Sequence, residues 1–262
     1  LLEVSNDPEE SLFTVITLLD RSKSLKEILN RTDPYVANLN DTGDRERIIK
    51  HRLFEGNPDS VDESEVRSVV ERYVDSYEYP IEIDEPKRYE NRMVESYPFH
   101  PEMVELLDSI FGAAKERQNV RGAMGVLADT VRRMHDETDL ILTSDIEPRS
   151  FRGINSTLFD RFVSDKESLE DTEYAEELLR VILLYTLDEQ KQEATTTECL
   201  LGTFKSDKAT VDQLHIALEG LYGNAHYLDK QDDSYFITED PKLTALVARE
   251  QDRVLENSPN DV

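Results

Sequence analysis

Apolar residues in this chain recur mainly at the three- and four-residue spacing of an amphipathic helix, and this spacing constrains the fold more than any other feature. Segments with this pattern cover residues 41–56, 64–78, 97–114, 120–134, 173–187, 195–204 and 210–222. Strand signals are short by comparison: a β-branched run at 12–19, an extended segment at 34–41 and a hairpin pattern near 226–240. The sequence therefore predicts a mainly α fold with small β elements.

The last third of the chain places its elements in a particular order. Three short helical segments are followed by AHYLDKQDDSYFITED, in which Tyr227 and Leu228 would face Tyr235 and Phe236 across a polar turn. Three helices followed by a two-stranded hairpin is the order of a winged-helix domain. With 262 residues, the chain is also long for one compact domain. We therefore expect three parts, at residues 1–41, 42–165 and 166–262.

The charge of the chain limits its partners. It has 57 acidic and 30 basic side chains, a formal net charge of −27, which repels nucleic acid and anionic membranes at ordinary ionic strength. The acidic residues are spread along the whole chain, Arg outnumbers Lys and Trp is absent. Since acidic surfaces stay hydrated in concentrated salt, where screening is short-ranged, we expect a halophile's cytoplasmic protein. An acidic partner-binding face is the alternative.

Several classes of site are excluded by the motifs that the sequence lacks. The single Cys199 rules out an internal disulfide and a cysteine-based zinc site. No P-loop, GxGxxG, HExxH or GxSxG motif occurs, and the five histidines are scattered. No stretch approaches transmembrane length, and no secretory leader pattern is present. We expect a soluble chain without independent catalysis.

One predicted helix begins with an unusual residue. In ERQNVRGAMGVLADTVRRM, residues 116–134, Arg121 precedes an apolar stripe that includes Leu127 and Val131. The helix macrodipole disfavours a cation at this end, so a bound anion would explain the arginine. The alternative is a surface arginine paired with Glu116 or Asp129.

This region also resembles a known family. VRGAMGVLADTV resembles the third lid helix of AAA+ ATPases of the replication-initiator branch, where the sensor-2 arginine opens a helix of the form Arg-x-Ala-Leu-x-x-Leu. FTVITLLD resembles the strand that carries sensor 1, and PYVANLNDTGDRERIIKHRLFE resembles the last core strand with the first lid helix. YPFHPEMVELLDSIFG followed by RQNVRG is similar to an archaeal and bacterial AAA+ family classed as a domain of unknown function. Its relatives are encoded near restriction-modification and phage-defence systems.

The resemblance, which runs from about residue 12 to 245, implies a role for each part. Residues 1–41 would end an α/β AAA+ core, 42–165 would form a helical lid and 166–262 a winged helix. The Walker A and B motifs would lie in a missing N-terminal ATPase core. ATP and Mg²⁺ would therefore bind only the full-length protein, and the chain by itself would take no cofactor. We accordingly expect a piece of a longer ATPase.

Three residues would contact nucleotide according to this resemblance. Arg121 would be sensor 2, touching the β- and γ-phosphates. Thr17 would be sensor 1, although a buried strand threonine is an equal alternative. Arg31 would be an arginine finger that acts on a neighbour's nucleotide, although a plain loop arginine is favoured there. We interpret His100, in YPFHP, as a packing or capping residue.

The winged helix raises the question of DNA binding. Its expected recognition helix, TVDQLHIALEGLY, has no Lys or Arg, and the hairpin offers Lys230 against three aspartates. Because phosphate contacts dominate nucleic-acid affinity, we expect a protein partner or a homo-oligomer, with DNA disfavoured and no membrane contact. The rival interpretation is a winged-helix DNA-binding regulator of a halophile. A helical scaffold without a ligand is a third.

Overall fold

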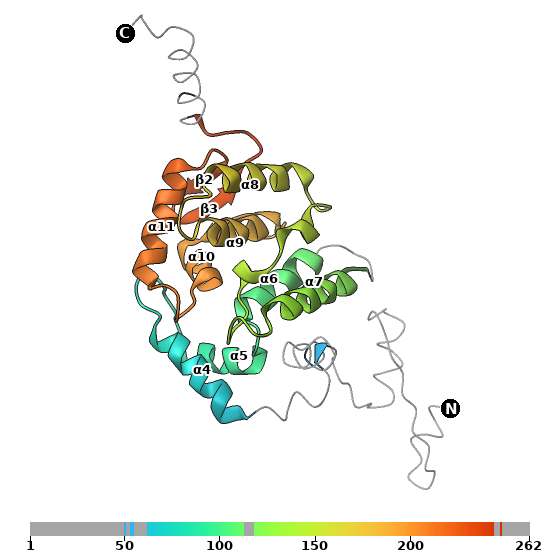
Figure 1. Ribbon diagram of the computed structural model, residues 1–262, viewed down its shortest axis with the longest axis vertical. Coiled ribbons are helices and arrows are strands. Elements are labelled where there is room, and N and C mark those ends of the chain that lie inside the picture. The colour runs from blue at the N-terminus through green and yellow to red at the C-terminus, as the bar shows by residue number, and fades with distance from the viewer. Residues whose placement is uncertain (1–49, 51–52, 55–61, 113–117, 244–246, 248–262) are drawn as a thin grey trace, which may run out of the picture. The chain divides into compact units, whose positions relative to one another are not determined.

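The computed structural model describes residues 50, 53–54, 62–112, 118–243 and 247, which belong to one compact unit of the chain (Figure 1). Its elements in chain order are α4 (Glu63–Asp75), α5 (Pro86–Ser96), α6 (Pro101–Gly112), α7 (Gln118–Met134), the 3-10 turns η2 (Thr143–Asp145) and η3 (Pro148–Phe151), α8 (Ser156–Ser168), α9 (Ala175–Leu187), β1 (Ala194–Thr195), α10 (Thr196–Thr203), α11 (Val211–Asn224), β2 (Leu228–Gln231) and β3 (Ser234–Ile237). The predicted class, mainly α with small β elements, is confirmed. Both strands predicted before residue 42 lie outside the described residues.

The elements from α9 to β3 follow the winged-helix order. The sheet is antiparallel with strand order β1-β3-β2, and α10 and α11 lie between its first and second strands in the chain. Capping boxes begin both helices: Thr195 with Glu198 for α10, and Thr210 with Gln213 for α11. The two-residue β1 was not predicted, because so short a strand shows no alternation of apolar and polar residues.

The hairpin has a different register from the predicted one. Leu228 pairs with Ile237 and Lys230 pairs with Tyr235, so Leu228 does not face Tyr235 or Phe236 as expected. A two-residue turn sets this register, with Asp232 in the left-handed region at φ 54°. The prediction placed the turn too early in the sequence, because hydrophobic alternation alone does not locate a turn.

Helix α5 is a second correction. The segment IEIDEPKRYEN, residues 81–91, lies between two predicted helical segments and was not among them, but Pro86 occupies the first turn of a helix there. Proline suits that position because its missing N–H would have no intrahelical partner. Tyr89, Met93 and Ser96 recur on one face and are buried. Because the segment contains six charged residues, this narrow buried stripe is hard to recognise from the sequence.

The hydrophobic core continues across the predicted limit at residue 165. Helices α6 to α9 and strand β3 share one cluster of buried residues, which includes Leu107, Leu127, Phe162 and Leu183. A second cluster joins α4 and α5 to α10 and α11. Helices assigned to the lid and to the winged helix therefore pack together, and the limits of the three parts stay predictions.

A buried carboxylate ties α8 to the hairpin. Asp165 is fully buried, and its two carboxylate oxygens accept hydrogen bonds from the backbone N–H groups of His226, at 2.7 Å, and Tyr227, at 2.9 Å. Hydrogen bonds to a charged group contribute more than neutral ones. This contact fixes the chain where it enters β2.

Asp165→Ala should lower the free energy of unfolding by about 2–3 kcal/mol, because two N–H groups lose a charged acceptor. Urea denaturation followed by circular dichroism would measure the loss. Asp160→Ala is the matched control on the same helix, since Asp160 forms a solvent-exposed ion pair with Arg152. It should cost less than about 1 kcal/mol, and equal losses in the two variants would contradict this account.

Candidate functional site

The first turn of α7 contains Arg121, which the sequence indicates as a candidate phosphate contact. Arg121 is the fourth residue of this helix, and its backbone is helical, as predicted. The side chain of Arg121 and the whole of Thr17 and Arg31 lie outside the part of the chain that the structure describes. The structure therefore does not test the three predicted nucleotide contacts, and their roles stay predictions.

Two glycines define the surroundings of that turn. A Cβ atom on Gly122 would lie 2.8 Å from the ring of Phe111, so glycine is needed for the close approach of α7 to α6. The Phe111 ring in turn packs 5.6 Å from that of Phe151. A Cβ atom on Gly125 would meet no described atom within 4 Å.

No contact with the described residues explains why position 125 is a glycine. Glycine in a helix interior costs about 1 kcal/mol relative to alanine, so its presence there calls for another cause. It lies four residues after Arg121, and residues four apart share one face of a helix. The exposed face of α7 thus has an open position at Gly125, four residues after Arg121 in the sequence.

The other end of α7 borders a cavity of about 370 Å³. Leu53 and Val131 contribute its apolar part, and the remaining lining is largely charged. Arg133 is held in place there, since it donates to the backbone oxygen of Asp145 at 2.7 Å and pairs with Asp129 at 3.4 Å. Arg132 is mostly exposed. Both arginines are exposed, and Arg133 is in addition bonded to the backbone of Asp145.

The YPFHP motif anchors α6. His100 is fully buried, and its Nε2 lies 3.3 Å from the Tyr77 hydroxyl and 3.2 Å from the Tyr89 hydroxyl. Its backbone N–H donates to the oxygen of Ile141 at 2.9 Å. Burial lowers the pKa of His100 to about 3, so the ring is neutral at physiological pH. The geometry gives His100 a packing role, as the sequence indicated.

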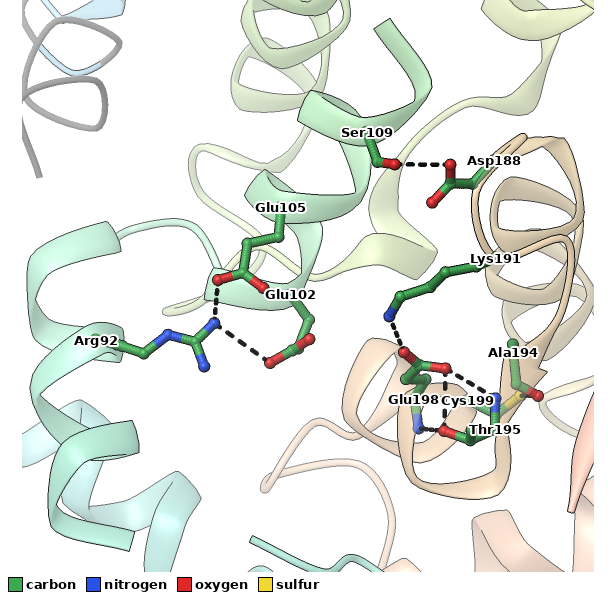
Figure 2. A network of polar contacts seen from close by, with 10 residues as sticks. All are labelled: Arg92, Glu102, Glu105, Ser109, Asp188, Lys191, Ala194, Thr195, Glu198 and Cys199. Atoms are coloured by element: carbon green, nitrogen blue, oxygen red, sulfur yellow. Dashed lines mark hydrogen bonds and ion pairs between the residues drawn. The ribbon is translucent and has the colours of Figure 1, made fainter. Parts of the chain in front are cut away.

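A group of polar side chains lies where α5 and α6 meet the end of α9 and the start of α10, and we call it the polar seam: Arg92, Glu102, Glu105, Ser109, Asp188, Lys191 and Glu198 (Figure 2). Arg92 of α5 pairs with Glu102, at 3.6 Å, and with Glu105 of α6. Ser109 of α6 donates to Asp188, which follows α9, at 2.7 Å. The seam thus links elements that are far apart in sequence.

At the start of α10, Glu198 contacts two other residues. It pairs with Lys191 and accepts a hydrogen bond from the backbone N–H of Thr195 at 2.9 Å, which caps α10. The ammonium of Lys191 lies 5.1 Å from the centre of the Tyr185 ring, within the range of a cation–π contact. One carboxylate therefore connects the turn after α9 to the start of α10.

Negative charge exceeds positive charge in this seam. Glu102, Glu105 and Glu198 face the two cations Arg92 and Lys191, and Glu102 is largely buried. Burial, with repulsion from Glu105, raises the pKa of Glu102 despite Arg92. No group of three or more His, Cys, Asp or Glu in the described part is placed to hold a metal ion. The seam is therefore a connection rather than a metal centre.

The outer surface of α11 bears on nucleic-acid binding. Its exposed residues include Asp212, Glu219 and Ile216, and it contains no Lys or Arg. In the hairpin, Lys230 pairs with Glu219 at 2.8 Å and lies over the Tyr235 ring at 4.7 Å. A phosphate contact would have to break that pair. The geometry thus adds an ion pair to the charge argument against DNA.

Comparison with known families places the chain. The family model described as the DUF499 second domain matches residues 43–197, which is more than half of the sequence. The chain belongs to the DUF499 family. No curated protein and no solved structure gives a significant match. The region shared with DUF499 begins before α4 and ends in the first turn of α10, so it includes the α7 turn and every residue of the polar seam except Glu198.

One further observation concerns the helices of this DUF499 chain. Within the described ranges, none is both long enough and apolar enough to cross a bilayer. The sequence did not reveal the seam, because its members belong to separate elements and each resembles an ordinary surface charge. The capping-box pattern T-x-x-E, formed by Thr195 and Glu198, was the sequence signal that could have identified one member of the seam, Glu198.

The two glycines of α7 give a paired prediction. Gly125→Ala should raise the free energy of unfolding by about 0.5–1 kcal/mol, because alanine favours the helix and meets open space. Gly122→Ala should lower it by about 1–3 kcal/mol, because its Cβ collides with the Phe111 ring. Urea denaturation of both variants would measure the difference. Destabilisation by Gly125→Ala would show that something already packs on this position.

Glu102→Gln should raise the free energy of unfolding by up to about 1 kcal/mol at pH 7.5, because it removes a charge that burial disfavours. Because the folded-state pKa of Glu102 is raised, the native chain should gain stability as pH falls through that pKa. The Gln variant should lack this gain, measured as the change in midpoint temperature between pH 7.5 and pH 5. Glu105→Gln, on the same helix and more exposed, is the control; equal pH responses in wild type and Glu102→Gln would contradict the prediction.

Proposed function

We propose that the chain is the lid and winged-helix portion of a AAA+ ATP-binding protein, which senses the state of the nucleotide and relays it to a partner. The proposal comes from the likeness of VRGAMGVLADTV to a sensor-2 helix. The observation that supports it best is the open face of α7, where Arg121 is followed one turn later by a glycine without a packing role. Membership of DUF499 agrees with the family suggested by the YPFHP region.

The chemistry of arginine suits this role. A guanidinium stays charged at all relevant pH values and binds phosphate oxygens through two parallel hydrogen bonds. Gly125 leaves room beside it, so that a large group can approach the helix backbone. ATP with Mg²⁺ would supply the phosphates and their charge. Since the described residues hold no metal-binding group, the Walker motifs of a longer chain would bind the ion.

The packing offers a route from α7 to the winged helix. Helix α7 contacts α6 closely at Gly122, and α6 contributes Glu102, Glu105 and Ser109 to the polar seam. A displacement of α7 would therefore shift α6 and the turn that leads into α10. In this proposal, the seam passes the lid position to the winged helix, whose outer helix carries it to a partner.

The remaining parts of the proposal concern context. Thr17 would act as sensor 1 and Arg31 as an arginine finger, which makes a second copy of the protein a natural partner. A halophilic cytoplasm and a relation to initiator-type and phage-defence ATPases follow from the acidic composition and the family resemblance. DNA stays a disfavoured partner. The winged-helix order supports the rival DNA-binding regulator, and fluorescence anisotropy with duplex DNA in molar potassium chloride would distinguish it by tight, sequence-specific binding.

Arg121→Gln in the longer protein should lower ATP turnover about 10- to 100-fold, because it removes a charge-assisted contact of about 1.5–3 kcal/mol. The measurement is phosphate release under saturating ATP, with thermal unfolding as a check that the fold is intact. Arg132→Gln is the matched control at the far end of the same helix, where the side chain is exposed. It should leave turnover unchanged.

Two outcomes would contradict the proposal. An Arg121→Gln protein with wild-type turnover would remove the sensor role. ATP turnover by the purified 262-residue chain would show that the catalytic motifs are not supplied by a longer polypeptide.

A further inference from the structure

The contact between η2, α9 and α10 contains three buried polar atoms that have no hydrogen-bond partner among the described residues. These atoms are Thr143 Oγ1 in η2, Arg180 Nε in α9 and Thr203 Oγ1 in α10. Thr143 is fully buried, and only 5% of Thr203 is exposed. Buried polar groups in native proteins are nearly always paired, with protein, with ordered water or with an ion. Three unpaired atoms in one contact therefore indicate a ligand.

The three atoms belong to one region of the core. Helix α9 contacts both η2 and α10, and α10 also contacts η2. Arg180 reaches η2 directly, since its Nη1 donates to the backbone oxygen of Ser144 at 3.2 Å. A Cβ atom placed on Gly202 would lie 3.3 Å from the Cβ of Thr143. Thr143 therefore packs against the last turn of α10, where Thr203 is the next residue after Gly202.

Positive charge exceeds negative charge around this turn, although the whole chain has a net charge of −27. Besides Arg180, two cations bond to η2: Arg133 donates to the backbone oxygen of Asp145, and Lys205 pairs with its carboxylate at 2.6 Å. In the described part of the chain, the ion pairs of this region contain five cations, Arg132, Arg133, Lys166, Arg180 and Lys205, and three carboxylates, Asp129, Asp145 and Glu176. The region thus has two more positive than negative charges.

We propose that Thr143, Arg180 and Thr203 bind one small monovalent anion, a halide such as chloride. The Nε–H of an arginine can only donate a hydrogen bond and a threonine hydroxyl is able to donate one, so all three groups can serve a single acceptor. A water molecule would also accept from them, but only an anion would offset the excess positive charge as well. A multivalent anion fits less well, because its burial costs more and the excess charge is small.

Binding of this ion would make the stability of the chain depend on chloride. A ligand that binds only the folded state raises the free energy of unfolding as its concentration rises. The ion would act between α9 and α10, at the turn that both helices contact. This inference goes beyond the proposed function and does not rest on the nucleotide role of α7.

Thermal unfolding of the full 262-residue chain would test the site, with potassium chloride replaced stepwise by potassium gluconate at constant ionic strength. Gluconate is too large for a buried halide site, so the wild-type midpoint should be higher in chloride. Thr143→Val removes the hydroxyl and nearly keeps the shape of the side chain, and it should lose this chloride-dependent shift. Thr203→Val should reduce the shift too, and it tests the site independently if Thr143→Val does not fold.

Thr130→Val is the matched control for a general effect of salt or of removing a buried hydroxyl. Thr130 is buried in α7, and its hydroxyl donates to the backbone oxygen of Val126 at 2.9 Å. This variant should keep the wild-type shift between the two salts. Loss of the shift in Thr130→Val as well would overturn the proposal, because the shift would then not report on η2.

The effect of Thr143→Val in each salt distinguishes the possible partners of the hydroxyl. With an anion bound, the variant should be less stable than the wild type in chloride only. An equal loss of stability in both salts would overturn the proposal in favour of a buried water molecule. A gain in both salts would overturn it as well, since removal of an unpaired buried hydroxyl relieves a desolvation cost.

Anomalous diffraction from crystals grown in bromide would locate the ion. We expect bromide beside the Arg180 Nε and Thr143 Oγ1 atoms. No anomalous peak at this position would overturn the proposal. A peak there without chloride-dependent stability in solution would mean an adventitious ion only, and would overturn it too.

Discussion

Burial of α9 on nearly all sides is the constraint on which the rest of the structure depends. Nine of its 13 residues are buried, whereas a helix on the surface of a domain buries one stripe. Neighbours must therefore surround it, and α6, α8, α10, α11 and β3 all contact it. A helix in this position cannot belong to one half of the molecule alone. It is for this reason that α6, α7 and α8 share a core with the elements from α9 to β3.

The polar seam has a different physical character from that core. Apolar contacts around α9 are non-directional, whereas the seam depends on a few paired charges with defined geometry. Glu102 is the least favourable of these, because it is largely buried and close to two other carboxylates. Such a group keeps the joint between α6 and α10 less stable than the core behind it.

A feature could be predicted from the sequence when many residues took part in its pattern. Long stripes such as that of α7 predicted their helices well, and the three helices before the hairpin predicted the winged-helix order. Helix α5 was missed because its charged residues outnumber a narrow buried stripe, and β1 because two residues make no pattern. The register of the hairpin depends on the left-handed backbone at Asp232, which hydrophobic alternation does not encode. The seam required the tertiary structure, because Ser109 and Asp188 are 79 residues apart and meet only when α6 packs against the end of α9.

Glycines also occur inside helices α7, α10 and α11. A glycine in a helix interior lowers stability, so each one calls for a contact that needs the missing side chain. Gly122 and Gly202 have such contacts inside the molecule, and they are the points where α7 meets α6 and where α10 meets α9. Gly125 and Gly220 have none, and they lie on the exposed faces of α7 and α11. Both glycines are therefore free of packing contacts with the described residues. One is on α7 and the other on α11, and α6 and α9 connect these two helices through the shared core.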